Sequence, residues 1–285
     1  MISILEKAYA KVNLFLDILH KRDDGYHEIK TILQTISLYD ELYFFESPYQ
    51  TSLICDGLDI PPEINLVYKS IEKVRNKTGC EKGVKIKLVK KIPSRAGLGG
   101  GSSDAASAIK GLNKLWNLGL SYEEMSEIGK EIGSDVPFFI TGGSVIAEGR
   151  GEILVSFLPT PDLFVIVIKP EVSISTPWAY NHWKADLNKT PVIDDFIKAF
   201  SENCFLNKNL LFNSFESIIE NYYPEIKEVR QTLREMGIKD ALLSGSGSSV
   251  FGLTEDLKMA ERVKSYFLNK KMECFVTKTV KRLDL

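Results

Sequence analysis

The sequence predicts an α+β protein built from two domains, and two observations carry that prediction. Segments typical of strands and of helices alternate along the chain, without internal repeats or low-complexity tracts. The segments after residue 158 follow an order that suggests a split βαβ arrangement. We therefore expect a first domain at 1–158 and a second domain at 159–285.

The first domain is expected to open on strands. Arg22–Gly25 has the composition of a turn, and Ile29–Phe45 has the composition of one or two strands. Before the turn, apolar residues alternate along a first strand, at Val12, Leu14, Leu16 and Ile18. The chain is therefore expected to enter the fold as a sheet.

A helix is expected near Asn65–Thr78, and a strand and a second helix follow it. The strand alternates apolar residues at Val84, Ile86 and Leu88. Pro93 should end this strand, because proline has no N–H to donate to a sheet. The second helix has apolar residues at three- and four-residue spacing, at Ala105, Ala106, Ile109, Leu112 and Trp116. Ser102 or Ser103 is expected to cap its first backbone amides.

Two further helices place an aspartate between them. Ser121 and Glu124 have the spacing of a capping box, and Gly133 is suited to the end of that helix. Its apolar face is expected at Met125, Ile128 and Ile132. Pro137 is tolerated in the first turn of the next, short helix. Asp135 should therefore lie just after one helix and just before another.

A hairpin around Glu148–Glu152 leads into the second domain, which begins near Pro161. Leu163–Ile168 is a continuous apolar run, as expected for a buried strand. A helix with apolar positions from Ile226 to Met236 should end at Gly237. The remaining elements are strands at 241–243 and 250–253 around a glycine turn, a helix at 259–267 and a strand at 274–280.

The junction Pro93–Asp104 reads P-S-R-A-G-L-G-G-G-S-S-D and predicts a phosphate site. Four of the five positions 97–101 are glycine, which permits positive φ and leaves the backbone N–H groups unshielded. The helix start adds free amides and the positive end of the helix dipole. The loop is not a Walker A motif, and Ser102 stands where G-x-G-x-x-G requires its third glycine. We interpret it as a third kind of phosphate loop, and a glycine-rich connection without a ligand is the alternative.

The loop resembles the phosphate-binding motif of the GHMP superfamily of small-molecule kinases. Six further segments resemble, essentially end to end, the branch that phosphorylates the 2-hydroxyl of 4-diphosphocytidyl-2-C-methyl-D-erythritol in the non-mevalonate isoprenoid pathway. They are A-Y-A-K-V-N-L-F-L at 8–16, D-G-Y-H at 24–27, N-L-V-Y-K at 65–69, G-S-D-V-P-F-F at 133–139, S-T-P-W-A-Y at 175–180 and S-G-S-G-S-S-V-F-G at 244–252. The resemblance implies a nucleotide-binding α/β domain and a ferredoxin-like domain, with the active site between them.

The resemblance implies that Lys11 and Asp135 are catalytic. At the matched positions, the aspartate takes the proton of the acceptor and the lysine supports that exchange electrostatically. We expect the two charges to keep each other ionised at neutral pH. From the residues alone, Asp135 is equally well a helix cap and Lys11 a solvated lysine. Asn13, two positions along a strand from Lys11, should share its face and hydrogen-bond the acceptor alcohol.

The resemblance also implies an aromatic site for the cytosine of the acceptor. Tyr26 and Tyr180 match stacking positions, and His27 matches the residue that reads the edge of the base. Position 180 is often Phe in the family, so its hydroxyl is a departure. Thr176 is expected to contact the diphosphate or the backbone. The alternative is that both tyrosines are ordinary surface or core residues.

The expected donor is ATP with Mg²⁺, and no dedicated metal site is expected in the protein. Main-chain N–H groups of the loop should wrap the triphosphate, while Asn65 reaches the adenine or the ribose. The residues expected to bind the nucleotide are Asn65, Pro93, Ala96, Gly97, Leu98, Gly99, Gly100, Gly101, Ser102 and Ser103. The glycine-rich turn Ser244–Ser249 should shape the floor of the cleft near Lys11, or it is a plain tight turn.

Composition limits the possible partners. The net charge is −2 over 285 residues, without a long Lys/Arg run, so neither nucleic acid nor membrane is an expected partner. The four cysteines are scattered without a C-x-x-C, which argues against a metal site. Without a leader or a membrane-spanning apolar run, we expect a cytoplasmic protein with a small-molecule substrate, either a monomer or a weak homodimer.

Two alternative functions remain at this point. The first is another GHMP kinase that acts on a simple alcohol such as homoserine or mevalonate, which the D-G-Y-H segment at 24–27 disfavours. The second is a non-catalytic RNA-binding or scaffold protein, because the fold of the first domain resembles domains of ribosomal proteins. The near-neutral charge and the presence of Lys11 and Asp135 oppose that reading.

Overall fold

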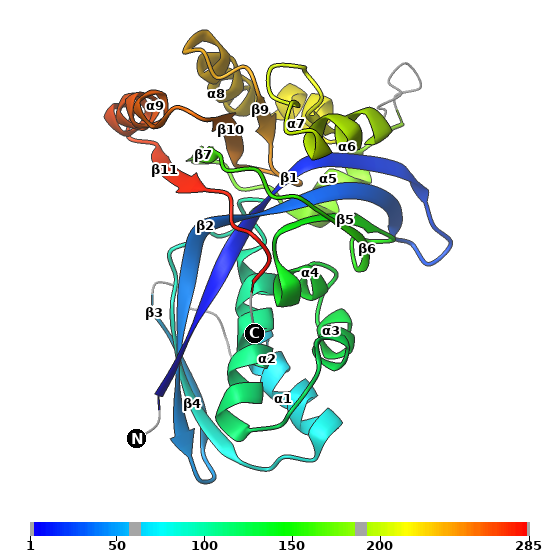
Figure 1. Cartoon of the computed structure of the whole chain (residues 1–285), viewed down its shortest axis with the longest axis vertical. Coiled ribbons are helices and arrows are strands. Elements are labelled where there is room, and N and C mark those ends of the chain that lie inside the picture. The colour runs from blue at the N-terminus through cyan, green and yellow to red at the C-terminus, as the bar shows by residue number, and fades with distance from the viewer. Residues whose placement is uncertain (1–2, 57–63, 186–192, 284–285) are drawn as a thin grey trace.

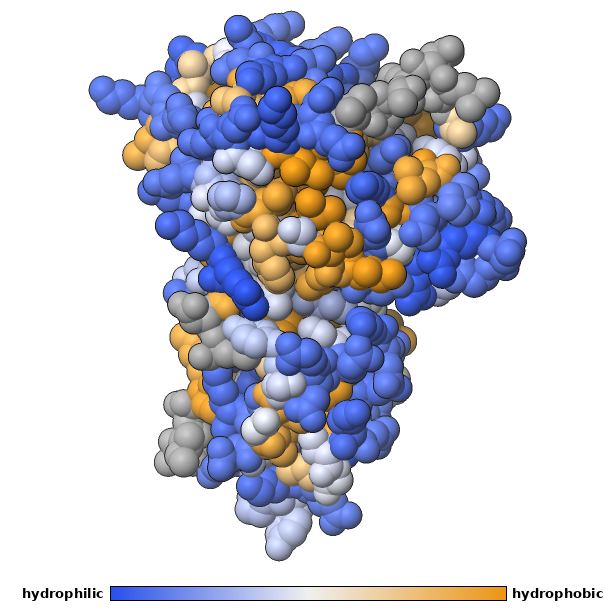
Figure 2. All heavy atoms as spheres, turned by 45° about the vertical axis from the view of Figure 1, so that its right-hand side comes forward, coloured by the Kyte–Doolittle hydropathy of each residue, from blue (hydrophilic) through white to orange (hydrophobic). Residues whose placement is uncertain are grey.

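The computed structural model describes residues 3–56, 64–185 and 193–283. The molecule has a lower and an upper part joined at a narrower middle, and long strands run from one part into the other (Figure 1). On the face shown in Figure 2, apolar residues gather just above this middle and hydrophilic residues surround them. No helix among the described residues is long and apolar enough to cross a membrane.

A seven-stranded sheet contains most strands of the first half. Its path is β3-β4-β2-β1-β8, with β5 paired to β2 and β6 paired to β5. The strands are β1 Ser3–Lys21, β2 His27–Ser47, β3 Thr51–Asp56, β4 Gly83–Val89, β5 Ser144–Glu148, β6 Ile153–Leu158 and β8 Phe212–Asn213. The predicted Ile29–Phe45 segment is one long strand, antiparallel to β1 over nearly its whole length.

The strand β1 is longer than the alternating segment that predicted it. Val12, Leu14 and Leu16 are buried, but Asn13 and Phe15 between them are buried too, and a register shift interrupts the alternation between Asn13 and Phe15. Both faces are covered, since helix α2 (Gly100–Trp116) packs on β1 and the second half supplies phenylalanines against Phe15. Alternation is therefore a weak guide to a strand that the fold encloses on both sides.

Four helices pack together beside this sheet in the lower part of Figure 1. They are α1 Leu66–Thr78, α2 Gly100–Trp116, α3 Tyr122–Lys130 and α4 Val136–Thr141. The apolar face predicted for α2 is buried throughout, from Ala105 to Trp116. The capping box of α3 is present in full, with Ser121 and Glu124 each bonded to the backbone of the other. One continuous core joins these helices to β2 and β4.

A four-stranded antiparallel sheet lies in the upper part, in the order β11-β7-β10-β9. Its strands are β7 Phe164–Lys169, β9 Ala241–Leu243, β10 Val250–Thr254 and β11 Glu273–Lys278. The associated helices are α5 Thr176–His182, α6 Ile193–Ser201, α7 Glu216–Tyr222, α8 Pro224–Glu235 and α9 Leu257–Asn269. The predicted strands and the helices α8 and α9 are present. Helices α5, α6 and α7 and strands β3 and β8 were not predicted from the sequence, and α5, α7 and β8 are short.

The two halves share a core instead of meeting as separate bodies. Strand β8, from the second half, pairs in parallel with β1 at Phe15 and Leu16. The last described residues return to the first sheet, where the Val280 N–H donates to the Thr35 carbonyl. A buried cluster contains residues of both halves, among them Val12 and Val165. These links hold the halves in a defined arrangement around the space between them.

Candidate functional site

A cavity of about 730 Å³ lies where the two halves meet. Its lining residues come from β1, from the loop before α2, from the start of α4, from α5 and from the turn after β9. All of the residues predicted to bind or react line this cavity, with the exception of Ser103. The fold therefore brings together positions that are far apart in the sequence, from Lys11 to Tyr180.

The predicted phosphate loop Gly97–Ser103 forms one side of the cavity. Gly97 and Gly99 have φ of 73° and 71°, in the left-handed region that glycine adopts most readily. A Cβ at Gly97 would lie 1.9 Å from the carbonyl oxygen of Ser244, so this position also requires glycine for close packing. The turn after β9 thus lies directly against the loop, and the hydroxyl of Ser244 donates to the Gly97 carbonyl at 2.9 Å.

The prediction that Ser102 or Ser103 caps α2 is wrong. The helix begins at Gly100, with Gly99 as its N-cap and with no side-chain cap within the described chain. Ser103 lies in the first turn, and its hydroxyl donates to the Tyr9 carbonyl on β1 at 2.6 Å. Gly99 has a φ of 71°, a left-handed conformation that glycine adopts readily and serine does not. The N-cap therefore lies at this glycine, before the serines. The first amides of α2 are therefore left without a side-chain acceptor.

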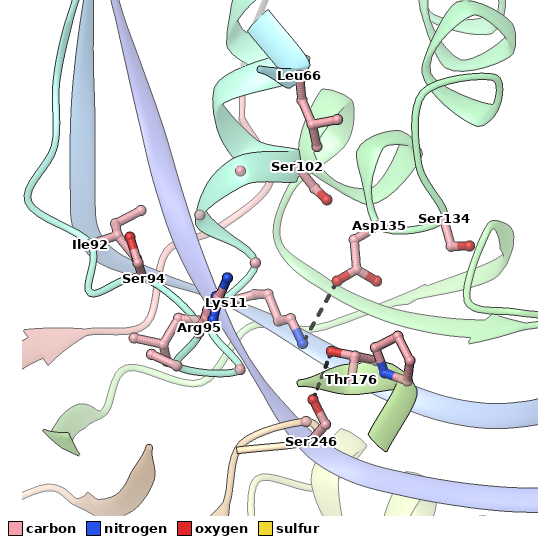
Figure 3. Close-up of a pocket in the computed structure, with 18 of the residues that line it drawn as sticks. Lys11, Leu66, Ile92, Ser94, Arg95, Ser102, Ser134, Asp135, Thr176 and Ser246 are labelled. Atoms are coloured by element: carbon pink, nitrogen blue, oxygen red, sulfur yellow. Dashed lines mark hydrogen bonds and ion pairs between the residues drawn. The ribbon is translucent and has the colours of Figure 1, made fainter. Parts of the chain in front are cut away.

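Lys11 and Asp135 face each other across the cavity (Figure 3). The Lys11 Nζ lies 3.8 Å from Oδ2 of Asp135, and the side chains are 6% and 33% exposed. The lysine rises from β1 beneath the loop, where its backbone N–H donates to the Leu98 carbonyl at 3.0 Å. Asp135 is the N-cap residue of α4 by position, yet its side chain makes no capping bond among the described residues. Its carboxylate is thus directed to the cavity and is not used as a cap.

Asn13 fixes the position of the Lys11 ammonium. Its Oδ1 accepts from the Lys11 Nζ at 2.5 Å, and its Nδ2 donates to Thr31 at 2.9 Å. The Thr31 hydroxyl in turn donates to the Phe15 carbonyl at 2.7 Å. The predicted shared face of Lys11 and Asn13 is confirmed. This buried chain of hydrogen bonds leaves the lysine little freedom to turn away from Asp135.

Burial and the nearby carboxylate act in opposite directions on Lys11. Burial lowers the pKa of Lys11, and the nearby charge of Asp135 raises it only in part. The net shift is downward from the usual lysine value, and the predicted ionisation of both groups at neutral pH stays a prediction. The reason for the downward shift is that 3.8 Å is too long for a direct hydrogen bond, so the attraction does not offset the loss of water around the ammonium.

The aromatic residues lie on the side of the cavity formed by the β1–β2 hairpin and α5. His27 stacks on Tyr180 with ring centroids 4.9 Å apart and planes 24° apart. Tyr180 also makes an edge contact with Phe215, and burial raises the pKa of its hydroxyl. Tyr26 is 55% exposed, and the guanidinium of Arg150 lies 4.7 Å from its ring centre. All of these residues line the cavity.

The other predicted contacts are partly occupied by structural bonds. The Oδ1 of Asn65 accepts from the Val67 N–H at 2.9 Å and so caps α1. The Thr176 hydroxyl lies 2.9 Å from that of Ser246, a contact that joins α5 to the turn after β9 (Figure 3). Pro93, Ala96 and the remaining loop residues line the cavity next to these groups.

Several lining residues were not predicted. Arg150 stands in the hairpin between β5 and β6, and Ser246 stands in the predicted glycine-rich turn. Lys90 and Asp104 flank the phosphate loop and form buried ion pairs. Their sequence neighbourhoods were recognised, but only the folded structure shows that their side chains reach the cavity. A charged residue between two glycines, as in G-R-G at Arg150, was the one available signal.

Comparison with known proteins agrees with this geometry. Residues 65–143 match the model of the GHMP kinases N terminal domain, and residues 188–274 match that of the GHMP kinases C terminal domain. The chain is 41% identical over 276 residues to the 4-diphosphocytidyl-2-C-methyl-D-erythritol kinase of Pelotomaculum thermopropionicum, covering 95% of this chain and 96% of the relative. It is 39% identical over 263 residues to the kinase of the same name from Bacillus subtilis (strain 168), covering 91% of each.

Solved structures give the same grouping. A crystal structure of 4-(cytidine 5'-diphospho)-2C-methyl-D-erythritol kinase has a TM-score of 0.83 and 32% identity, over 97% of this chain and 99% of that one. A homoserine kinase from Cytophaga hutchinsonii, with a TM-score of 0.76 and 19% identity, shares the fold. The predicted two-domain fold and the predicted resemblance are confirmed. The chain belongs to the 4-diphosphocytidyl-2-C-methyl-D-erythritol kinase family of the GHMP kinases.

Proposed function

We propose that this chain transfers the γ-phosphate of ATP to the 2-hydroxyl of 4-diphosphocytidyl-2-C-methyl-D-erythritol, a step of the non-mevalonate isoprenoid pathway. The observation that carries the proposal is the Lys11–Asp135 pair, 3.8 Å apart in a cavity that has a glycine-rich loop on one side and aromatic rings on the other. Relatives that span nearly the whole chain bear the name of this activity. A homoserine kinase and a mevalonate kinase are 19% and 20% identical to this chain, so their similarity supports the fold alone.

The donor is proposed to bind on the loop side. The uncapped first amides of α2 and the positive end of its dipole favour the triphosphate. Gly97 and Gly99 permit the backbone to turn its N–H groups toward the phosphates. Asn65 and Pro93 line the part of the cavity next to the loop and are proposed to contact the nucleoside. The Ser103 N–H donates to the Gly99 carbonyl and its hydroxyl donates to the Tyr9 carbonyl, so Ser103 is proposed to act by fixing the first turn of α2.

The chemistry is proposed to occur at Asp135 and Lys11. The partly exposed Asp135 carboxylate accepts a hydrogen bond from the 2-hydroxyl and receives its proton as the new O–P bond forms. The Lys11 ammonium meets the negative charge of the phosphoryl group in transfer, which is the main requirement of a loose transition state. Asn13 holds this ammonium in place and has one remaining N–H for the acceptor. The bond to ADP breaks, and ADP leaves with both bonding electrons.

The acceptor is proposed to lie against the aromatic side. Tyr26 and Tyr180 present ring faces for the cytosine, and His27, already stacked on Tyr180, reads its edge. Thr176 and the guanidinium of Arg150 are proposed to meet the diphosphate. The single charged group among these, Arg150, lies over Tyr26 and thus next to a proposed base site.

Magnesium is proposed to accompany the nucleotide. Among the described residues, no group of three or more His, Cys, Asp or Glu side chains could hold a metal ion. The residues fit an ion that phosphate oxygens and water would mainly hold, and the Asp135 carboxylate in the cavity lining would be available to it. When bound, the ion neutralises phosphate charge.

The remaining features of the proposal concern the setting of the enzyme. We propose a cytoplasmic enzyme with a small-molecule substrate, without nucleic-acid or membrane partners, acting as a monomer or a weak homodimer. We also propose that the nucleotide-binding domain ends near residue 158, where the last large strand of the first sheet ends.

The test is a comparison of acceptors. Purified protein is incubated with ATP and Mg²⁺ and with the diphosphocytidyl methylerythritol, homoserine, mevalonate or galactose, and ADP release is measured. We expect turnover with the cytidylated alcohol alone, and phosphorus NMR of the product should show a new phosphomonoester. Turnover with a different alcohol alone would refute the proposed substrate and the roles of Tyr26, His27 and Tyr180.

A further inference from the structure

Three ionisable residues with largely buried side chains connect the two ends of the phosphate loop. They are Asp40 on β2, Lys90 just after β4 and Asp104 near the start of α2, and we call them the loop clamp. The Lys90 Nζ donates to Oδ2 of Asp40 at 2.5 Å and to Oδ2 of Asp104 at 2.6 Å. The side chains are 0%, 10% and 5% exposed in the order Asp40, Lys90 and Asp104. None of these residues has a part in the chemistry described above.

The clamp connects the segment before the phosphate loop to the helix α2 that follows it. Oδ1 of Asp40 accepts the backbone N–H groups of Lys91 and Ile92, the residues just before Pro93. Asp104 belongs to the helix that leaves the loop, so Lys90 links the two sides through one ammonium. A Cβ at Gly100 would lie 3.4 Å from the Lys90 Nζ, which places the clamp directly behind the first residue of α2.

The clamp contains two carboxyl groups and one ammonium. The Asp40 carboxylate accepts three hydrogen bonds, from the Lys90 Nζ and from the backbone N–H groups of Lys91 and Ile92. Asp104 has Lys90 alone, and its Oδ1 has no hydrogen-bond partner among the described residues. Two ionised carboxylates would leave a net negative charge directly behind a loop whose proposed ligand is a polyanion.

The surroundings of Asp104 favour its protonated form. Burial raises the pKa of Asp104 to about 8, and the charge of Asp40 adds to this rise while that of Lys90 opposes it. Burial lowers the pKa of Lys90, but Asp104 and Asp40 together more than offset this, so its pKa is raised. When Asp104 is protonated, Asp40 is the remaining opposite charge beside the ammonium. Cys55 on β3 also lies near the three clamp residues, and burial raises the pKa of its thiol.

We propose that Asp104 is a positioning residue for ATP that works as a neutral carboxylic acid, so that the clamp carries no net charge behind the bound triphosphate. This inference rests on the proposed function, and Asp104 acts through Lys90 and α2 without touching a substrate. Loss of its proton at alkaline pH adds a negative charge behind the loop and weakens the binding of the nucleotide.

The first test compares D104N with the wild type. Asn has the shape of the protonated acid and cannot ionise. The affinity of D104N for a non-hydrolysable ATP analogue should therefore lack the pH dependence that Asp104 causes in the wild type. Between about pH 7 and about pH 9.5, we expect the wild-type Kd to rise about tenfold more than the D104N Kd. Parallel profiles for the two proteins would overturn the proposal. In steady-state kinetics the same difference should fall on the KM for ATP and not on kcat.

The variant D104A tests the positioning role separately from the charge. It leaves Lys90 and Asp40 as a neutral pair but removes the connection to α2. We expect D104A to bind the analogue about tenfold more weakly than D104N at neutral pH, with an equally flat pH profile. Equal affinities of D104A and D104N would show that the connection does not position the loop.

An infrared measurement on the nucleotide-free protein completes the test. In protein labelled with ¹³C at aspartate carboxyls, the C=O stretch of a protonated carboxylic acid should be present at pH 7 and absent from D104N. Its absence from the wild type would overturn the neutral form of Asp104, and this readout does not depend on which substrate the enzyme uses. If the band is present but the protein binds no ATP analogue, the proposed function and the positioning role are both overturned. The protonated form of Asp104 would still be supported in that case.

Discussion

Two lysines with largely buried side chains lie next to the phosphate loop, and their surroundings shift their pKa values in opposite directions. Lys90 has two carboxyl oxygens at 2.5 and 2.6 Å, whereas Lys11 has its nearest carboxylate oxygen at 3.8 Å. The pKa of Lys90 is raised and that of Lys11 is lowered. A closely paired charge holds the backbone in place, while a loosely paired charge stays available for a ligand.

The largest expected effect concerns the loosely paired site. Asp135→Asn removes the proton acceptor but keeps the shape of the side chain, so we expect kcat to fall by about 10² to 10⁴. Circular dichroism and thermal unfolding should stay close to the wild type, because Asp135 makes no capping bond in the described structure. Asp56→Asn, on an exposed ion pair, is the matched control and should keep its activity. A near-normal kcat for Asp135→Asn would remove this residue from the mechanism.

The second prediction contrasts the lysines directly. Lys90→Met leaves two buried carboxyl groups without their shared donor, so we expect a loss of about 3 to 5 kcal/mol in the free energy of unfolding. Lys11→Met removes an ammonium that burial already disfavours, and it should fold with a far smaller change while losing turnover. Urea unfolding of both variants checks this. Equal destabilisation would mean that distance to the carboxylate does not separate the two roles.

A third buried lysine extends the comparison to a site without a bonded carboxylate. The Lys110 Nζ donates to the Phe139 carbonyl at 3.2 Å, and burial lowers its pKa to about 8. Lys110→Met should therefore raise the free energy of unfolding by about 1 to 3 kcal/mol at neutral pH, because it removes the cost of a buried charge.

The pH dependence of this effect has a definite sign. Between about pH 8 and the usual lysine pKa near 10.5, the unfolded chain binds the proton that folded Lys110 has lost. The contribution of Lys110 to the free energy of unfolding of the wild type therefore rises with pH across that window. The gain in the free energy of unfolding from Lys110→Met should shrink accordingly. Unfolding curves at several pH values measure this. A constant difference would assign the effect to packing and not to charge.

The smallest expected effect lies at the outer, aromatic side of the cavity. Tyr26→Ala removes one proposed stacking face, worth about 1 to 3 kcal/mol, so the KM for the cytidylated acceptor should rise about tenfold. The KM for ATP should not change, since Tyr26 stands away from the phosphate loop on the β1–β2 hairpin. Tyr49→Ala, also exposed, is a suitable control. An unchanged acceptor KM would favour a simpler alcohol.

Local sequence patterns predicted those parts of the site that depend on neighbouring residues. The glycine-rich loop, the capping box at Ser121 and the position of Asp135 between two helices all follow from short-range backbone preferences, and the structure has each of them. The prediction of a serine cap for α2 failed for a related reason. The helix starts at Gly100 after the left-handed Gly99, and the Ser103 hydroxyl donates to the Tyr9 carbonyl instead of capping the helix.

Long-range contacts could not be derived in the same way. The role of Asp40 depends on its meeting Lys90, which lies fifty positions later. Arg150 reaches Tyr26 only because the β5–β6 hairpin lies beside the β1–β2 hairpin. Periodic patterns in one sequence do not show which distant residues come into contact, because the curvature and closure of the sheets decide those contacts.

The sequence by itself therefore determined the order of most helices and strands, the phosphate loop and the family, because these depend on local chemistry and on motifs of fixed spacing. The tertiary structure decided how each charged group is paired. Burial removes water from Lys11, Lys90 and Lys110 alike, but the distance to the nearest acceptor differs at each one. That distance sets whether a buried lysine binds a ligand, holds the backbone or only adds a cost to folding.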